Sequence, residues 1–249
     1  MQEKIDLYEP INSLKKLAGN IWIADGPVIH FKGFPFPTRM TVIRLGSGDL
    51  FVHSPIGLTA ELGGAIDRLG PVRHLVSPNR IHYWWIGEWG TRYRDATKWA
   101  SPGARRAAAK QGWRFDRDLG EGPDEAWAEE VDQLIVRASR FLAEVVFFHK
   151  PSRTLILADL IENFEPSRVH SRLLRGLMRI GGVSDPDGSM PLDLRLGCWG
   201  RRGQMRRALE RMIAWAPERI VLAHGRCYET GGVAELRRAF RWIRGLDEA

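Results

Sequence analysis

SPNRIHYWWIGEW, residues 77–89, is the stretch on which the interpretation of this chain depends most. It follows the apolar run HLV, which is typical of a strand end, and it places Asn79 and His82 just beyond that end. Loops at strand ends often carry functional side chains, whereas tryptophans are costly to expose. The stretch could therefore be the remains of a metal site, a substrate pocket or the well-packed start of a helix.

The composition is that of an ordinary globular protein and argues against several classes. The 249 residues are 44% hydrophobic, which is enough for a full core, and the apolar runs are far shorter than a membrane span. The start MQEKIDLYEP is polar and is followed by no apolar signal segment. Two cysteines are too few for a disulfide framework. We expect a cytoplasmic protein with no transmembrane segment and a single domain over residues 1–249.

The net charge of +7 is placed unevenly, because the whole basic excess lies in residues 133–249. Much of it belongs to two arginine clusters, GRRGQMRRALER (200–211) and RRAFRWIR (237–244). These clusters could bind nucleic acid, an acidic lipid surface or an anionic substrate. They could equally be the solvated faces of two amphipathic helices, and we favour this interpretation because binding requires the clusters to converge.

Strand and turn signals divide the chain into two β-rich halves. Residues 38–55 contain two strand-like runs joined by Gly-Ser-Gly-Asp, and VVFFHKPSRTLILAD is a second hairpin joined by Lys-Pro-Ser-Arg. Strands are also predicted over 72–77 and 218–225, and residues 116–132 are predicted to be a loop or a short irregular helix. Because helical segments surround both halves, the pattern predicts an αββα sandwich of two mixed sheets packed face to face and flanked by helices.

Helical spacing marks the segments between the strands. Residues 58–70 predict a helix that begins near Thr59 and ends at Gly70. Further helices are expected over 86–96, 103–112, 203–215 and 232–246. In SRVHSRLLRGLMRIGG, the spacing predicts one shared apolar face made of Val169, Leu173, Leu177 and Ile180.

Metal-competent side chains follow three predicted strands. His82 comes after HLV, Asp159 ends TLILAD, and His224 ends RIVLAH. Two imidazoles and a carboxylate can hold one divalent metal ion and leave positions open for water or substrate. Each residue alone could be structural, because strand-end histidines are often hydrogen-bonded and Asp159 could cap a turn. Their equivalent positions nevertheless predict one shared polar site.

Four short motifs resemble a known family. PTRMTVIRL, VHSP, SPN-x-x-H and PSRTLIL-x-DL are similar to those of the uncharacterised DUF4336 branch of the metallo-β-lactamase superfamily. The resemblance implies an αββα sandwich and a metal motif His-x-His-x-Asp-His, to which Ser77-Pro78-Asn79-Arg80-Ile81-His82 corresponds. The first-metal histidines are thus replaced by Ser77 and Asn79, and the motif aspartate by Ile81. His82, Asp159 and His224 match three other ligands, whereas the superfamily's middle histidine falls near residues 138–141, where no histidine is present. The resemblance therefore implies at most one divalent metal, zinc, iron or manganese.

Other residues near these loci are candidates for catalysis or binding. His53, at the end of LFVH, could be a fourth ligand or an acid–base group, and Glu88 could orient His82 or act as a base.

The aromatic residues have two interpretations. Trp84, Trp85 and Trp89 could pack a short helix onto the sheet, which we favour, or could form an aromatic wall for a substrate that Asn79 also contacts. The segment GFPFPTR (33–39), which ends in Arg39, could form a second wall and bind substrate.

These residues favour a metal-dependent hydrolase of a small ester, lactone or thioester-like substrate, with a mononuclear site and with Asp159, His53 and Glu88 as catalytic candidates. The alternative is a non-catalytic ligand-binding protein in which the same residues only hydrogen-bond to one another. A third hypothesis, nucleic-acid handling by the C-terminal arginines, is weakest because the metal motif is incomplete.

Overall fold

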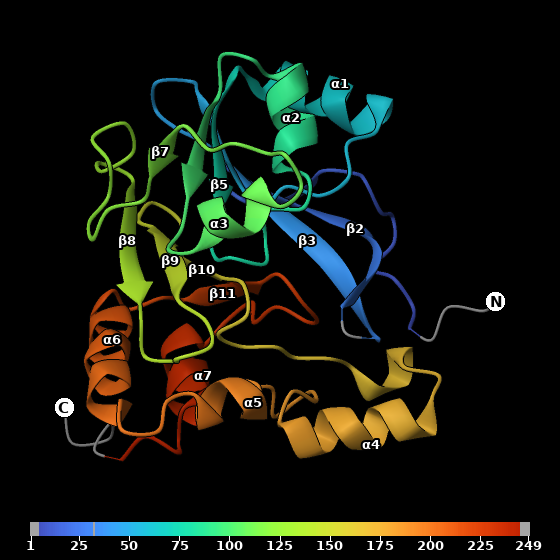
Figure 1. Ribbon diagram of the computed structural model, residues 1–249, viewed down its shortest axis with the longest axis vertical. Coiled ribbons are helices and arrows are strands. Elements are labelled where there is room, and N and C mark those ends of the chain that lie inside the picture. Colours follow the sequence, from blue (N-terminus) through green and yellow to red (C-terminus); the bar gives the residue numbers. More distant parts are fainter. Residues whose placement is uncertain (1–4, 32, 245–249) are drawn as a thin grey trace. The chain divides into compact units, whose positions relative to one another are not determined.

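The computed structural model describes residues 5–31 and 33–244, which fold into two compact units (Figure 1). The N-terminal unit consists of residues 7–130. The C-terminal unit consists of residues 131–244 together with residues 5 and 6. Each unit has its own sheet and its own helices. No helix among the described residues is long and apolar enough to cross a membrane.

The N-terminal unit contains a seven-stranded sheet whose strands are adjacent in chain order. The strands are β1 (Lys15–Ala18), β2 (Ile21–Phe31), β3 (Phe34–Arg44), β4 (Leu50–His53), β5 (Val72–Ser77), β6 (Thr97–Ala100) and β7 (Arg117–Asp118). Pairing is antiparallel from β1 to β4 and parallel from β4 to β7. Because β4 and β5 are parallel, their carboxyl ends meet at the same edge, and His53 pairs with Val76.

Helices connect the parallel strands of this unit: α1 (Ala60–Leu69), α2 (Ile86–Arg92) and α3 (Ala104–Ala109). The predicted limits of the first helix are confirmed, because the Thr59 side chain accepts a hydrogen bond from the Leu62 N–H and Gly70 caps the other end. Leu62 and Ile66 are fully buried in the core of the unit. The predicted loop over 116–132 contains the short strand β7, and β1 was not predicted.

The C-terminal unit contains a four-stranded sheet in the order β11–β10–β9–β8. Its strands are β8 (Val131–Val136), β9 (Glu144–His149), β10 (Thr154–Leu157) and β11 (Arg219–Leu222). The other elements are the 3₁₀ helix η1 (Pro166–Arg168) and the helices α4 (Arg172–Gly181), α5 (Leu192–Leu196), α6 (Arg202–Ala214) and α7 (Gly232–Ala239). Strands β10 and β11 are parallel and Leu157 pairs with Leu222, so the segments after both strands leave at the same edge.

Leu173, Leu177 and Ile180 share one face of α4 as predicted, but this face does not pack against the core. Val169 is buried but precedes the helix, whereas Leu173, Leu177 and Ile180 are exposed. Leu174 and Met178 are the α4 residues that the unit buries. The apolar residues of α4 cover a wider part of the helix surface than the part that packs against the core. The spacing of apolar residues alone does not show which part is buried. Helix α5 was not predicted, and α7 ends at Ala239, earlier than expected.

Candidate metal-binding groups in the two units

The loop after β5 is built by the residues that precede His82. The buried Ser77 hydroxyl donates to the Asn79 carbonyl oxygen at 2.9 Å. The Asn79 side-chain oxygen accepts from the backbone N–H groups of Ile81 at 2.8 Å and of His82 at 3.2 Å. Such local amide bonds fix a tight turn. Asn79 therefore shapes the loop that carries His82, and its expected contact with substrate stays a prediction.

Ser54 holds the ring of His82, a contact that the sequence did not predict. The Ser54 Oγ lies 2.7 Å from His82 Nδ1, and the Ser54 N–H donates to the Val76 carbonyl oxygen at 2.9 Å. The Ser54 backbone has a φ of 53°, a left-handed conformation that residues with a side chain rarely adopt. Such strain is frequent at functional sites. When Nδ1 donates its proton to Ser54, the lone pair of His82 is on Nε2, where it can bind a metal ion.

His53, which directly precedes Ser54 in the chain, is a buried neutral imidazole. Its side chain is only 1% exposed at the end of β4. Burial, followed by the positive charge of His82, lowers the pKa of His53 to about 3. The ring is therefore uncharged at neutral pH. It is a suitable metal ligand and a weak general base.

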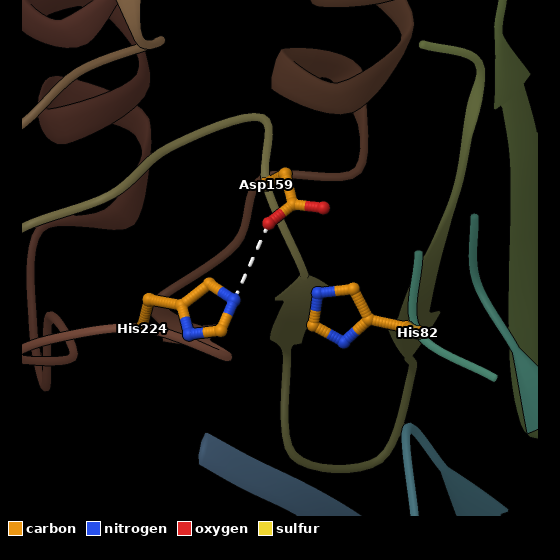
Figure 2. A group of neighbouring side chains, drawn as sticks. All are labelled: His82, Asp159 and His224. Atoms are coloured by element: carbon orange, nitrogen blue, oxygen red, sulfur yellow. Dashed lines mark ion pairs between the residues drawn. The ribbon is translucent and has the colours of Figure 1, made fainter. Parts of the chain in front are cut away.

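In the C-terminal unit, the buried side chains of Asp159 and His224 are in direct contact (Figure 2). His224 Nε2 lies 3.3 Å from Asp159 Oδ1, and both side chains are less than a tenth exposed. Each residue lies two positions after its strand, which explains the contact because Leu157 and Leu222 are paired. Gly225 has a φ of 86°, and a Cβ there would overlap the Asn163 carbonyl oxygen. Only glycine fits directly after His224.

Two further carboxyl groups interact with Asp159, and the sequence reasoning missed both. The buried Glu144 carboxylate accepts from the backbone N–H groups of Ala158 at 2.8 Å and Asp159 at 2.7 Å. Burial and then the negative charge of Asp159 raise the pKa of the buried Glu162 well above its usual range. In the sequence, Glu144 could have been noticed only as a single charged residue at the start of the apolar run EVVFFH. Glu144 therefore contacts Asp159 through its backbone, and Glu162 interacts with it through its charge.

Arg39 is committed to an ion-pair network within the N-terminal sheet. Its guanidinium is buried, with Nε 2.8 Å and Nη2 2.7 Å from Asp25 Oδ1. Lys15 Nζ lies 2.8 Å from the other oxygen of Asp25. Asp25 and Arg39 are directly paired between β2 and β3, which accounts for the contact. This network gives Arg39 a structural role, and substrate binding by it stays a prediction.

The other candidates lie on helix α2 or directly before it. Glu88 is exposed and accepts from the Leu58 N–H at 3.3 Å, whereas the partner of His82 Nδ1 is Ser54. Trp89 is fully buried and donates from its indole to the Ile56 carbonyl oxygen at 2.7 Å. Trp84 and Trp85 are half-buried with tilted rings 6.3 Å apart. Trp89 anchors the helix, and Trp84 and Trp85 stay candidates for a substrate wall.

Comparison with protein families decides the affiliation. Residues 19–172 match the family described as domain of unknown function DUF4336. The chain belongs to the DUF4336 family. The family match spans β2 to the first residue of α4, and so includes His53, His82 and Asp159. A search of curated proteins finds no significant match.

Solved structures confirm the predicted fold class. The DIM-1 metallo-β-lactamase exposed to ceftazidime matches with a TM-score of 0.64 and 15% identity, covering 96% of each chain. A metallo-β-lactamase from Pontibacter korlensis has a TM-score of 0.64 and 14% identity over 96% of this chain and 100% of its own. The mono-zinc form of FIM-1 from Pseudomonas aeruginosa has a TM-score of 0.60 and 14% identity over 95% and 94%. The DUF4336 chain therefore has the α/β sandwich fold of metallo-β-lactamases.

Proposed function

We propose that this protein is a metal-dependent hydrolase in which His82, Asp159 and His224 bind a single divalent ion. The observation that carries the proposal is the buried Asp159–His224 pair, an imidazole and a carboxylate at the ends of two parallel strands. His82 is the third member of the group that could hold an ion, and Figure 2 labels all three. The mono-zinc form of FIM-1 is a precedent for one ion in this fold.

The donor set fits a catalytic ion. Two imidazoles and one carboxylate leave a coordination position open, as in catalytic zinc sites. Supporting contacts are also present, because Ser54 holds Nδ1 of His82 and Glu144 binds the backbone N–H of Asp159. A second ion has poor support, because Ile81 has no ligand atom and the Asn79 oxygen already accepts two backbone hydrogen bonds.

The chemistry would be hydrolysis of a small ester, lactone or thioester. When bound, the ion would act as a Lewis acid toward substrate and water. The Asp159 carboxylate would stay ionised beside the ion and could accept a proton. The neutral His53 ring could add a ligand or orient a water, and the half-buried Trp84 and Trp85 could contact an apolar part of the substrate.

The second candidate is a non-catalytic member of the family that binds a ligand without metal. It is favoured by the direct contact of His224 with Asp159, since two residues that satisfy each other need no ion. The two candidates differ in their response to metal, because an ion that binds only the folded protein must stabilise it.

The deciding experiment compares the parent with Asp159→Asn, a change of nearly equal shape. Protein purified without chelator is analysed for metal content, then stripped, reloaded with zinc, iron or manganese, and unfolded by heat. We expect at most one ion per chain and a rise in melting temperature that Asp159→Asn abolishes. The control Asp187→Asn removes the same charge from an exposed site in the same unit and should keep the rise.

The reloaded parent is then assayed with small esters, lactones and thioesters. Metal-dependent turnover that Asp159→Asn loses would support the hydrolase. No metal response after stripping and reloading would refute metal binding and leave the non-catalytic candidate. Two ions per chain that His82→Ala removes together would show that the proposed ligand set is wrong.

A further inference from the structure

The C-terminal unit exposes a group of large apolar side chains. Trp199 is 76% exposed, Leu173 and Ile180 are each 74% exposed, and Leu196 is 61% exposed. Together with smaller exposures on the same segments they form what we call the α4–α5 surface: Phe141, Leu173, Leu177, Ile180, Leu192, Leu196 and Trp199. Side chains this exposed project outward as ridges. Exposed apolar surface of this extent, with polar residues around it, is typical of an interaction site.

Hydrogen bonds hold the segments of this surface together. Helices α4 and α5 are in contact and lie nearly end to end in Figure 1. Arg195 of α5 donates to the Ser189 hydroxyl, which in turn donates to the Gly182 carbonyl oxygen at the end of α4. The Arg140 N–H donates to the Gly197 carbonyl oxygen at 3.0 Å, which places Phe141 beside the end of α5. The exposed residues therefore belong to segments of the C-terminal unit that are joined by hydrogen bonds.

The charge around these residues is strongly basic. In α4, Leu173, Leu177 and Ile180 share one face by their i, i+4, i+7 spacing. Arg172, Arg175 and Arg179 form a second, parallel row on the same helix, separated from the apolar row by the exposed Gly176. Helix α4 contains no acidic residue, and α5 contains only Asp193. Arg140, Arg201 and Arg202 extend the positive charge around Phe141 and Trp199.

We propose that the α4–α5 surface binds an anionic lipid membrane from one side. Arginines would meet lipid phosphates, while the projecting leucines, Ile180 and Trp199 would enter the boundary between headgroups and acyl chains. Tryptophan favours this boundary because its ring is apolar and its N–H is polar. A fluid surface suits projecting ridges, whereas a folded protein partner would need a matching groove. The proposal does not depend on the hydrolase activity.

The test uses the full chain with vesicles of phosphatidylcholine, alone or mixed with phosphatidylglycerol. We expect sedimentation with the anionic vesicles at low salt, weaker sedimentation at high salt, and almost none with phosphatidylcholine alone. The triple variant Arg172→Gln, Arg175→Gln, Arg179→Gln should bind roughly 100-fold more weakly, since each basic residue contributes about a fivefold gain near an anionic surface. The control triple Arg94→Gln, Arg106→Gln, Arg114→Gln removes the same charge from exposed sites in the N-terminal unit and should bind as the parent does.

Insertion is tested with the double variant Leu173→Ser, Ile180→Ser. Both side chains are exposed in the folded protein, so the variant should keep the parental melting temperature and bind roughly tenfold more weakly or worse. Unchanged binding by this variant would show simple attraction of a basic protein and would overturn the proposal. Absence of binding to anionic vesicles, or equal loss in the control triple, would overturn it as well. A dimer in sedimentation equilibrium that this variant dissociates, without vesicle binding, would assign the surface to a second copy of the chain instead.

Discussion

Mild acid should destabilise the metal-free protein through His53. The pKa of this buried imidazole is lowered from 6.5 to about 3 by burial and by the charge of His82. Below pH 6.5, His53 therefore binds a proton in the unfolded chain but not in the folded chain. The free energy of unfolding falls as the pH falls. At about 1.4 kcal/mol per pH unit below the unfolded pKa, the loss is about 2 kcal/mol at pH 5 and roughly 5 kcal/mol near pH 3.

The assay is urea unfolding of chelator-treated protein at about pH 7 and about pH 5. His53→Asn changes the stability at both pH values, so the decisive quantity is the difference between them. That difference should be about 2 kcal/mol smaller in His53→Asn than in the parent. Other groups with shifted pKa values, such as Glu162, titrate in both proteins and cancel. His30→Asn removes an exposed imidazole and should behave as the parent does. Equal pH dependence in the parent and His53→Asn would refute the burial of a neutral His53.

Two further substitutions test the contacts around the proposed ligands. Ser54→Ala removes the partner of His82 Nδ1 and should weaken metal binding about 10- to 100-fold with little change in melting temperature, as measured by competition with a metal indicator. Unchanged affinity would show that Ser54 does not orient the ring. Gly225→Ala should destabilise the protein by about 3 kcal/mol or more in urea unfolding, because its backbone is left-handed and a Cβ would overlap the Asn163 carbonyl oxygen. Gly231→Ala has a similar φ but open space around it, so it should cost only about 1 kcal/mol, and equal costs would refute the overlap.

Local signals in the sequence were sufficient for most of the fold. The strand over 72–77 has the predicted limits, and the first helix is capped by Thr59 and Gly70 as expected. The Asp159–His224 contact was also foreseeable, because both residues lie at equivalent distances beyond two buried strands that pair in parallel. Strand ends are set by short-range patterns and pairing by general sheet rules, which explains this success.

Contacts that depend on long-range packing were not foreseeable. Glu144, at the start of β9, accepts a hydrogen bond from the backbone N–H of Asp159, which lies 15 positions later in the chain. Ser54 meets His82 only because β4 and β5 are parallel neighbours. Arg39 looked available for substrate, yet its register on β3 sets it opposite Asp25. In each case the residue type was visible in the sequence, but its partner was decided by pairing or packing far along the chain.

The structural roles of the residues in the altered metal motif favour a retained function. The residues that replace ligands have structural roles, because Ser77 and Asn79 build the loop before His82. The candidate ligands, in contrast, are held by residues in energetically unfavourable conformations, such as Ser54 with its left-handed backbone. In the C-terminal unit, the buried Glu144 and Glu162 both interact with Asp159, and burial followed by the charge of Asp159 raises the pKa of Glu162. A divalent cation beside Asp159 would offset the repulsion among these acidic groups. We infer that the strain and the buried acid are maintained for such an ion, since hydrogen bonding alone could be achieved by neutral residues at lower cost.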